Sequence, residues 1–451
     1  MYYIGIDLGS TYIKSALLNI EEGRVEKYNR YKMPSRIQNR KDCYYEISAL
    51  EILKSILYQV DELAREYSGI RGIILSTQMH GFVYCVKGRE DTYVSWQDTR
   101  CLNQFGKDQN TYMDVLDKLI SEELKSSGVH MKTSLGVCNL YTLLKEEKLR
   151  SNGELHTLGS YLIHKMTGNN ACHITNGAPL GLVNIVEREW NSGMIDKLGF
   201  SGMHFPKLIK EDTEVCGVYR SSGQEIPVYA DFGDQQCAVL GSMCTSEDAV
   251  INIATASQVS VIDRHFSMDH AYEVRPYFAG RYLKTISNMP SGRNLEVLTG
   301  FIQNLVKEFT GITLDTEQIW EIIASSYHGN ASGLMVDMTF YQERGGSISG
   351  ITASNFGVYE LFAAVFQGMA QVYWENICKL RDADSIKRLI CAGGVSWKRL
   401  ELIEAIRNIS GKECIRSTVQ DEVLFGIFRI ALVCEKLCDD FDKQPDIILK
   451  A

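Results

Sequence analysis

One pattern of strand, polar turn and returning strand occurs twice in this sequence, and it constrains the fold more than any other feature. The first copy runs from Tyr3 to Leu18 around the turn Gly9-Ser10-Thr11, and the second runs from Val250 to Ile262 around Ala254–Ser257. Short apolar runs bounded by turn residues are typical of strands. The sequence therefore predicts two halves of related topology, which we divide into domains 1–244 and 245–451.

The other predicted elements fit a mixed α/β protein. Apolar residues recur at helical spacing from Ala49 to Tyr67, and the buried run Ile70–Leu75 follows the helix-ending Gly69. A meander, a helix and a strand in this order begin an α/β domain. Further helices are predicted at Tyr112–Leu124, Leu140–Lys148, Leu155–Met166, Val358–Leu380, from Trp397, and at Asp421–Leu437, and further strands at Val25–Met33, Val228–Ala230 and Leu389–Cys391.

Composition excludes several classes of protein. A chain of 451 residues is long enough for two or three cores, and 45% hydrophobic with 23% charged residues is ordinary globular composition, which excludes a mainly disordered chain. Lys and Arg number 47 against 56 Asp and Glu, and a net charge of −9 argues against a nucleic-acid partner. The 13 cysteines are scattered without a Cys-x-x-Cys pair, so we expect reduced thiols rather than a zinc site. Without a signal peptide or a long apolar run, we expect a cytoplasmic protein with no membrane partner.

The first turn has the chemistry of a phosphate site. Gly9 allows backbone N–H groups to approach a ligand, and the hydroxyls of Ser10 and Thr11 and the ammonium of Lys14 can donate to phosphate oxygens. Asp7 directly before the turn can hold hydrated Mg²⁺. The same residues also fit an ordinary hairpin turn, because Asp and Gly are common turn residues.

Two segments of the second half can also receive a nucleotide. Thr255 lies in the second turn, where a phosphate contact and a simple Ser/Thr turn fit equally well. Ile390–Ser396 is a strand followed by Gly393, Gly394 and a helix, which allows a flat ligand against the backbone and a phosphate at the helix N-terminus. A tight connection between strand and helix explains these glycines nearly as well. The chain contains neither a Walker A sequence nor Gly-x-Gly-x-x-Gly.

Together these loops resemble the phosphate and adenosine segments of the actin-like ATPases, and three further motifs resemble the FGGY family of carbohydrate kinases. They are Ser-Thr-Gln-Met-His-Gly at Ser76–Gly81, Ser-Trp-Gln-Asp-Thr-Arg at Ser95–Arg100, and Phe-Gly-Asp-Gln-Gln-Cys-Ala at Phe232–Ala238. Within the family, the segments Trp96–Cys101 and Arg275–Phe278 are most similar to sedoheptulokinases. The second turn lacks the usual glycine, and Val395 stands where the family has a third glycine.

The resemblance implies an α/β fold with two domains, that of the actin-like ATPases (ribonuclease H-like), with the active site in an interdomain cleft. It assigns the sugar and the catalytic base to domain 1–244 and the nucleotide to domain 245–451. Asp234 would be the base and, with Asp7, a ligand of Mg²⁺, although a helix N-cap is its structural alternative. Trp96 either walls the sugar site or belongs to the core. The implied substrate contacts are Gln78, Met79, His80, Asp98, Arg100 and Gln235, and the implied nucleotide contacts are Gly9, Ser10, Thr11, Lys14, Thr255, Gly393 and Gly394.

The implied activity is ATP- and Mg²⁺-dependent phosphorylation of a ketose at its terminal primary hydroxyl, with sedoheptulose as the expected substrate and sedoheptulose 7-phosphate as the product. A xylulokinase or another pentulose kinase is the alternative, whereas glycerol kinases carry Gln-Arg-Glu where this chain has Gln78-Met79-His80. A non-catalytic sugar sensor is an alternative of another class, which the presence of both Asp7 and Asp234 disfavours. We expect a monomer or homodimer.

Overall fold

The computed structural model describes residues 1–38, 41–107, 109–325, 327–341, 345–443, 445 and 447. The chain forms two compact units, the first comprising Met1–Gly241, Asp263–Leu283 and Asp421–Ala451, the second Ser242–Ile262 and Lys284–Gln420. The second unit thus begins near the predicted boundary, but two later segments belong to the first unit. The assignment of sugar to residues 1–244 and nucleotide to 245–451 stays a prediction.

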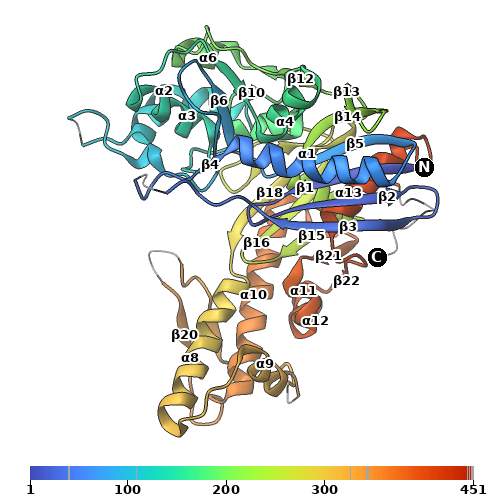
Figure 1. The fold of residues 1–451 in the computed structure, drawn as a ribbon. Helices are drawn as coiled ribbons and strands as arrows, with labels where there is room; N and C mark the ends of the chain where they lie inside the picture. The colour runs from blue at the N-terminus through green and yellow to red at the C-terminus, as the bar shows by residue number, and fades with distance from the viewer. Residues whose placement is uncertain are drawn as a thin grey trace. The chain divides into compact units, whose positions relative to one another are not determined.

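The first unit contains a large mixed sheet with helices on both faces and a smaller helical and strand region (Figure 1). Its elements are β1 (Tyr2–Leu8), β2 (Tyr12–Asn19), β3 (Arg24–Lys32), β4 (Glu46–Ser48), α1 (Ala49–Glu66), β5 (Ile70–Thr77), β6 (Phe82–Cys85), β7 (Thr92–Val94), α2 (Tyr112–Lys125), α3 (Gly136–Glu146), β8 (Glu154–His156), α4 (Leu158–Thr167), β9 (Ala171–His173), α5 (Ile174–Gly177), β10 (Val183–Asn184), β11 (Glu189–Trp190), α6 (Ser192–Leu198), β12 (Lys207–Ile209), β13 (Val215–Ser221), β14 (Gln224–Gly233), α7 (Asp234–Gly241), β17 (Glu273–Pro276) and α13 (Glu422–Cys434).

The large sheet of this unit has the strand order β13-β14-β5-β1-β2-β3. Strands β1, β2 and β3 form the predicted antiparallel meander, while β5 runs parallel to β1 and β14 runs parallel to β5. The register aligns Asp7 with Ser76, and Thr77 with Gly233. Because parallel strands end at the same edge of a sheet, the carboxyl ends of β1, β5 and β14 lie together, which is where α/β proteins commonly bind ligands.

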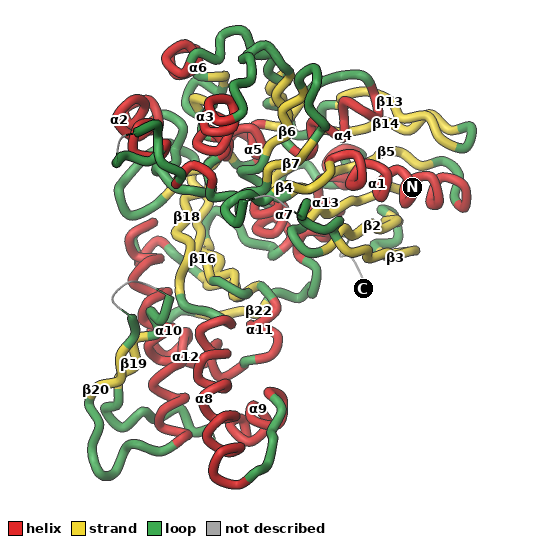
Figure 2. The backbone as a smooth tube through the Cα atoms, turned by 60° about the vertical axis from the view of Figure 1, so that its left-hand side comes forward, coloured by secondary structure: helices red, strands yellow, loops and turns green. Residues whose placement is uncertain are grey.

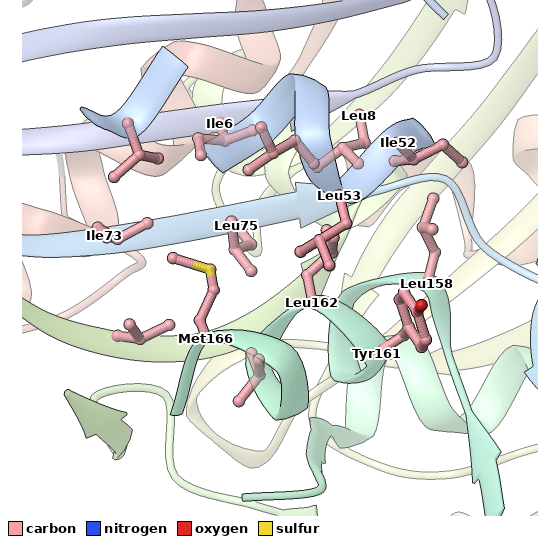
Figure 3. Close-up of a cluster of buried hydrophobic side chains, with 14 of the residues drawn as sticks. Ile6, Leu8, Ile52, Leu53, Ile73, Leu75, Leu158, Tyr161, Leu162 and Met166 are labelled. Atoms are coloured by element: carbon pink, nitrogen blue, oxygen red, sulfur yellow. The ribbon is translucent and has the colours of Figure 1, made fainter. Parts of the chain in front are cut away.

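Alternation along β1 decides which helices its side chains meet. Ile6 points to one face and packs with Ile52 of α1 and Leu162 of α4 in the core of the unit (Figure 3). Burying each aliphatic side chain of this kind contributes about 1.5–3 kcal/mol. Gly5 points to the opposite face, where an added Cβ would lie 3.0 Å from Ile427 of α13. Asp7 shares that face with Gly5, so it lies on the side covered by α13 rather than by α1.

Three helix predictions in this unit were wrong at their ends, among them Asp421–Leu437, where the helix spans Glu422–Cys434. The helix predicted at Leu155–Met166 begins only at Leu158, because Glu154–His156 forms β8 and the Thr157 hydroxyl caps the helix by accepting the Ser160 N–H. The helix predicted at Leu140–Lys148 spans Gly136–Glu146.

The second unit contains another mixed sheet and a set of long helices (Figure 2). Its elements are β15 (Asp248–Ile253), β16 (Ser257–Asp263), β18 (Tyr282–Met289), α8 (Gly292–Thr310), α9 (Thr316–Ser325), β19 (Met335–Asp337), β20 (Ser347–Ser349), α10 (Val358–Leu380), β21 (Arg388–Ala392), α11 (Gly394–Lys398), α12 (Leu400–Ser410) and β22 (Glu413–Arg416). No helix in the described parts of the chain has both the length and the apolar character needed to cross a membrane.

The sheet of the second unit repeats the arrangement found in the first. Its strands follow the order β18-β16-β15-β21-β22, with β15 antiparallel to β16 and parallel to β21, which is parallel to β22. This matches the order β3-β2-β1-β5-β14, so the predicted relation between the two halves is confirmed. Helix α10 has the predicted bounds and packs against α12 and, through the Phe362 and Phe366 rings, against Trp320 of α9.

The helix predicted from Trp397 starts three residues earlier, at Gly394. Gly393 has φ 84°, a conformation that glycine adopts without strain, so the chain turns directly from β21 into α11. The Ser396 hydroxyl then donates to the Gly393 carbonyl at 2.7 Å and closes the turn.

Candidate active site

The carboxyl ends of β1, β5 and β14 bring together most of the expected first-unit residues. Gln78 follows β5, and its backbone N–H donates to the Leu8 carbonyl at 2.9 Å. Its side-chain Nε2 donates to the Gly9 carbonyl at 3.4 Å. Gln78 therefore joins the expected sugar motif to the expected phosphate turn within one unit.

The carboxylate at the end of β1 is paired with a lysine on the next strand. The Lys14 ammonium lies 3.1 Å from Asp7 Oδ2 and 2.9 Å from Asp421 Oδ2. Burial raises the pKa of Asp7 to about 6, although the Lys14 charge opposes this. In this structure Lys14 is thus held between two carboxylates, while Ser10 and Thr11 of the adjoining turn are exposed.

Asp234 is the first residue of α7, directly after β14. Its Oδ1 accepts the adjacent Gln235 N–H at 2.8 Å, whereas an N-cap side chain accepts an N–H two or three residues further on. Burial and the negative charge of Asp7 raise the pKa of Asp234 to about 7, against the opposing charge of Arg275. Part of the residue stays exposed, so the carboxylate is suited to accept a proton from a ligand near neutral pH.

His80 is held as a neutral ring. Its Nδ1–H donates to the Pro179 carbonyl at 2.9 Å, which makes Nε2 the acceptor. Burial, followed by the charges of Lys132 and Arg275, lowers the pKa of His80 well below its usual value. The neighbouring Met79 is buried, and a Cβ on Gly233 would lie 2.7 Å from its sulfur, so Met79 packs against the end of β14.

Asp98 and Arg100 lie inside the protein. The guanidinium of Arg100 donates to Asp98 through Nε at 2.9 Å and Nη2 at 2.7 Å, and Nη2 also contacts Glu46 at 2.8 Å. The Tyr45 N–H donates to the second oxygen of Asp98 at 2.7 Å. Both residues have no exposed surface, so in this structure they support the loop carrying Trp96 rather than face a ligand. Trp96 is 40% exposed and is not part of the core.

Three charged side chains near Gln235 and His80 were not predicted as part of the site from the sequence. Lys132 and Arg275 both contact Glu273, and Arg275 also donates to the side-chain oxygen of Gln235, one of the expected substrate contacts. Lys132 lies in a stretch without a recognisable motif. Arg275 was named only as part of the segment Arg275–Phe278, which resembles sedoheptulokinases. No local sequence pattern could predict this contact, because Lys132 and Glu273 are 141 residues apart in sequence and meet only in the folded chain.

The second unit brings its own expected nucleotide residues close to one another through α8. The Arg293 N–H donates to the Thr255 carbonyl at 3.3 Å, so the N-terminus of α8 lies against the second turn. An added Cβ at Gly292 would lie 3.3 Å from Val395, and one at Gly393 would lie 2.4 Å from Asn252 of β15. The turn, the start of α8 and the glycine junction therefore share one corner of this unit. Gly394 is exposed there, as is Thr255.

The residues also fit the donor set expected for Mg²⁺. Among the described residues there is no group of three or more His, Cys, Asp or Glu side chains that could hold a metal ion alone. Mg²⁺ is commonly bound by one or two carboxylates together with water and substrate phosphates. The negative charge of Asp7 acts on the Asp234 carboxylate, and these two carboxylates supply suitable oxygen ligands.

Comparison with known proteins identifies the family. The sequence model of the N-terminal domain of the FGGY family of carbohydrate kinases matches residues 2–241, which is more than half of the chain. The chain belongs to the FGGY family. It is therefore an ATP-dependent sugar phosphotransferase with the two-domain fold of the actin-like ATPases, as the motifs predicted.

Individual relatives in this family act on different sugars. The sedoheptulokinase of Mus musculus is 25% identical over 82% of this chain and 84% of its own length. The xylulose kinase of Staphylococcus xylosus is 23% identical over 99% of this chain and 93% of its own length. The crystal structure of a xylulose kinase from Brucella ovis superposes with a TM-score of 0.83 at 17% identity, covering 98% of this chain and 92% of that one, which shows a common fold.

Proposed function

We propose that this FGGY kinase transfers the γ-phosphoryl group of ATP to the terminal primary hydroxyl of a ketose, with sedoheptulose as the preferred acceptor and sedoheptulose 7-phosphate as the product. The observation that carries this proposal is the carboxylate of Asp234, a residue of intermediate exposure at the start of α7, whose pKa burial raises to about 7. Similarity to the mouse sedoheptulokinase supports the choice of sugar.

In the proposed reaction, Asp234 accepts the proton of the primary hydroxyl as its oxygen attacks the γ-phosphorus. Mg²⁺ held by Asp7 and Asp234 would neutralise negative charge on the phosphate oxygens. The turn Gly9–Thr11 would supply nucleotide contacts from the first unit, as would Lys14 once released from its carboxylate partners. Thr255 and the Gly393-Gly394 junction would supply them from the second.

The acceptor contacts favour a polyhydroxylated substrate. His80 Nε2 can accept a hydrogen bond from a sugar hydroxyl because its Nδ1–H is already donated to Pro179. Gln78 Oε1 is a buried acceptor without a hydrogen-bond partner in the described structure. A site whose polar groups need substrate hydroxyls rejects acceptors that lack them.

A coupled ADP-release assay over a panel of acceptors tests this proposal. We expect the highest kcat/KM for sedoheptulose, a lower value for D-xylulose or D-ribulose, and a negligible value for glycerol. His80→Ala should lower kcat/KM for the ketose about tenfold or more, while the KM for ATP stays nearly constant, because one hydrogen bond to the acceptor is lost. Glycerol as the best acceptor would contradict the proposed roles of Gln78 and His80.

A pentulose kinase is the second candidate. It is favoured by the similarity to the Staphylococcus xylosus xylulose kinase, which extends over 99% of this chain. Both candidates use the same base and the same terminal hydroxyl chemistry. The panel separates them, because a pentulose kinase would give its highest kcat/KM with D-xylulose or D-ribulose.

A further inference from the structure

Three charged side chains lie beside the proposed acceptor contacts and have no part in the phosphoryl-transfer chemistry described above. The Lys132 ammonium is 2.6 Å from Glu273 Oε1, and Arg275 Nη2 is 2.9 Å from Glu273 Oε2. Each oxygen of one carboxylate is thus paired with a different cation. We call these residues the Lys132–Glu273–Arg275 cluster.

The backbone fixes the cluster in place. The Val274 N–H donates to the Gly128 carbonyl at 2.7 Å, and His130 Nε2 donates to the Tyr272 carbonyl at 3.0 Å. Gly128 has φ 72°, and a Cβ there would lie 2.0 Å from the Val274 carbonyl oxygen, so glycine permits this close approach. The segment that carries Lys132 is therefore fixed against the strand that carries Glu273.

Arg275 connects the cluster to the proposed acceptor site. Its Nη1 donates to the side-chain oxygen of Gln235, the residue next to Asp234. The residue is 6% exposed, and its Nε is buried without a hydrogen-bond partner in the described structure. Its charge and that of Lys132 also act on His80, so the cluster lies near proposed sugar contacts from two separate segments.

Lys132 differs from the other two members because it reaches solvent. Its side chain is 31% exposed, against 12% for Glu273 and 7% for Arg275. An ammonium carries three N–H donors, and the ion pair with Glu273 uses one of them. The cluster as a whole contains two cations and one carboxylate. Its net positive charge favours ligand groups that accept hydrogen bonds over ligand groups that donate them.

Building on the proposed function, we propose that Lys132 is a substrate-binding residue that donates hydrogen bonds to hydroxyl or carbonyl oxygens of the sugar acceptor. Glu273 and Arg275 act as positioning residues that hold the Lys132 ammonium and the Gln235 amide. The substrate class is a polyhydroxylated chain that extends from His80 to Lys132. This adds a third contact region to those formed by Gln78–His80 and Asp234-Gln235.

Steady-state kinetics of Lys132→Met and Lys132→Arg, measured in the full chain, test the proposal. The acceptor is the carbohydrate that wild type phosphorylates best in a panel of ketoses, aldoses, alditols and aldonates. Lys132→Met should raise the KM for that acceptor about 10- to 100-fold, the effect of losing a hydrogen bond from a charged donor, with kcat and the KM for ATP changed less than about twofold. Lys132→Arg keeps the charge and should recover most of the affinity.

Two further variants make the result specific. Lys125→Met removes an exposed lysine whose partner is Glu122 at 2.7 Å, and it should leave every constant unchanged. Glu273→Gln keeps the shape of the carboxylate but weakens the hold on Lys132, so it should raise the acceptor KM by less than Lys132→Met does. A melting temperature close to that of wild type would show that each variant is folded.

An unchanged acceptor KM in folded Lys132→Met would overturn the proposal, as would an equal rise in the KM for ATP. These outcomes are separate from failure of the proposed function, which would appear in wild type as a best acceptor that is not a ketose. Even then, the effect of Lys132→Met on the best acceptor would decide whether Lys132 binds it.

Discussion

The two halves of this kinase place different chemistry at the same point of the same topology. In the first unit, Asp7 lies one residue before the end of β1 and faces Lys14 across the meander. In the second unit, Asn252 lies one residue before the end of β15 and faces Gln258. A charged pair in one half thus corresponds to a neutral amide pair in the other.

We propose that the two units divide the tasks of catalysis and nucleotide recognition between them. The first unit keeps Asp7 and Asp234 close together at the edge of its sheet, where burial raises the pKa of each. Ionised carboxylates are costly in such a place, so their presence points to a chemical role. The second unit instead presents hydroxyl and glycine residues, which suit recognition of a nucleotide by backbone groups. Variants of each unit test whether catalysis depends on the carboxylates of the first and nucleotide recognition on the glycines of the second.

The largest effect should come from Asp234→Asn. Asparagine keeps the size of the side chain but cannot accept the hydroxyl proton, and loss of a general base costs about 10²–10⁴-fold in rate. We expect kcat to fall by that factor while circular dichroism and the melting temperature remain close to wild type. Near-normal kcat in a folded variant would remove Asp234 from its proposed role and weaken the contrast between the halves.

A second, smaller effect should come from Gly393, which joins β21 to α11 in the second unit. Gly393→Ala forces an L-residue into φ 84°, with its Cβ 2.4 Å from Asn252 Oδ1, so we expect a loss of about 1–3 kcal/mol in unfolding free energy and weaker nucleotide binding. Gly394→Ala is the matched control for the loss of unfolding free energy, since no atom lies within 4 Å of the added Cβ. Urea unfolding and nucleotide titration would measure both variants. Equal stability of the two variants would contradict the strain argument.

Local sequence pattern predicted much of the fold. The meander was confirmed, with β1 and β2 largely buried, and so were the helix from Ala49 and the long helix Val358–Leu380, each of which buries one face. Helix ends were less predictable, as in the case of Leu158, where a single threonine cap decides the start. Helix α8 was not predicted at all. Only four of its nineteen residues are buried, so its sequence carries a weak core signal.

The site was predictable where motifs carried it and not where distant segments meet. Asp7 and Asp234 were paired from sequence through the family resemblance of their motifs, and the strand order found in the structure places both at one edge of the sheet. The burial of Asp98 could not, because it depends on Arg100 and Glu46 converging from different segments. Lys132 was missed for the same reason, since its partner Glu273 comes from a segment inserted much later in the chain.

The smallest expected effect concerns Asp231, a buried carboxylate three residues before Asp234. It accepts hydrogen bonds from Thr157 at 2.8 Å, Asn176 at 2.6 Å and the His173 N–H at 2.9 Å. Burial nevertheless raises its pKa to about 6, compared with about 3.9 in an unfolded chain. The folded protein therefore binds this proton more tightly than the unfolded protein does. The resulting stability is fully present below pH 4 and is lost as the pH rises through 6.

Wild type should therefore gain about 1 kcal/mol of unfolding free energy from this group between pH 7 and pH 5, and Asp231→Asn should lack that gain. Urea unfolding of the ligand-free protein at both pH values measures the difference. Glu22→Gln, at an exposed position, is the matched control and should retain the wild-type pH dependence. If Asp231→Asn showed the same gain as wild type, the buried carboxylate would not be the source. The free-energy cost of burying carboxylates in the first unit would then have to come from Asp7 and Asp234 alone.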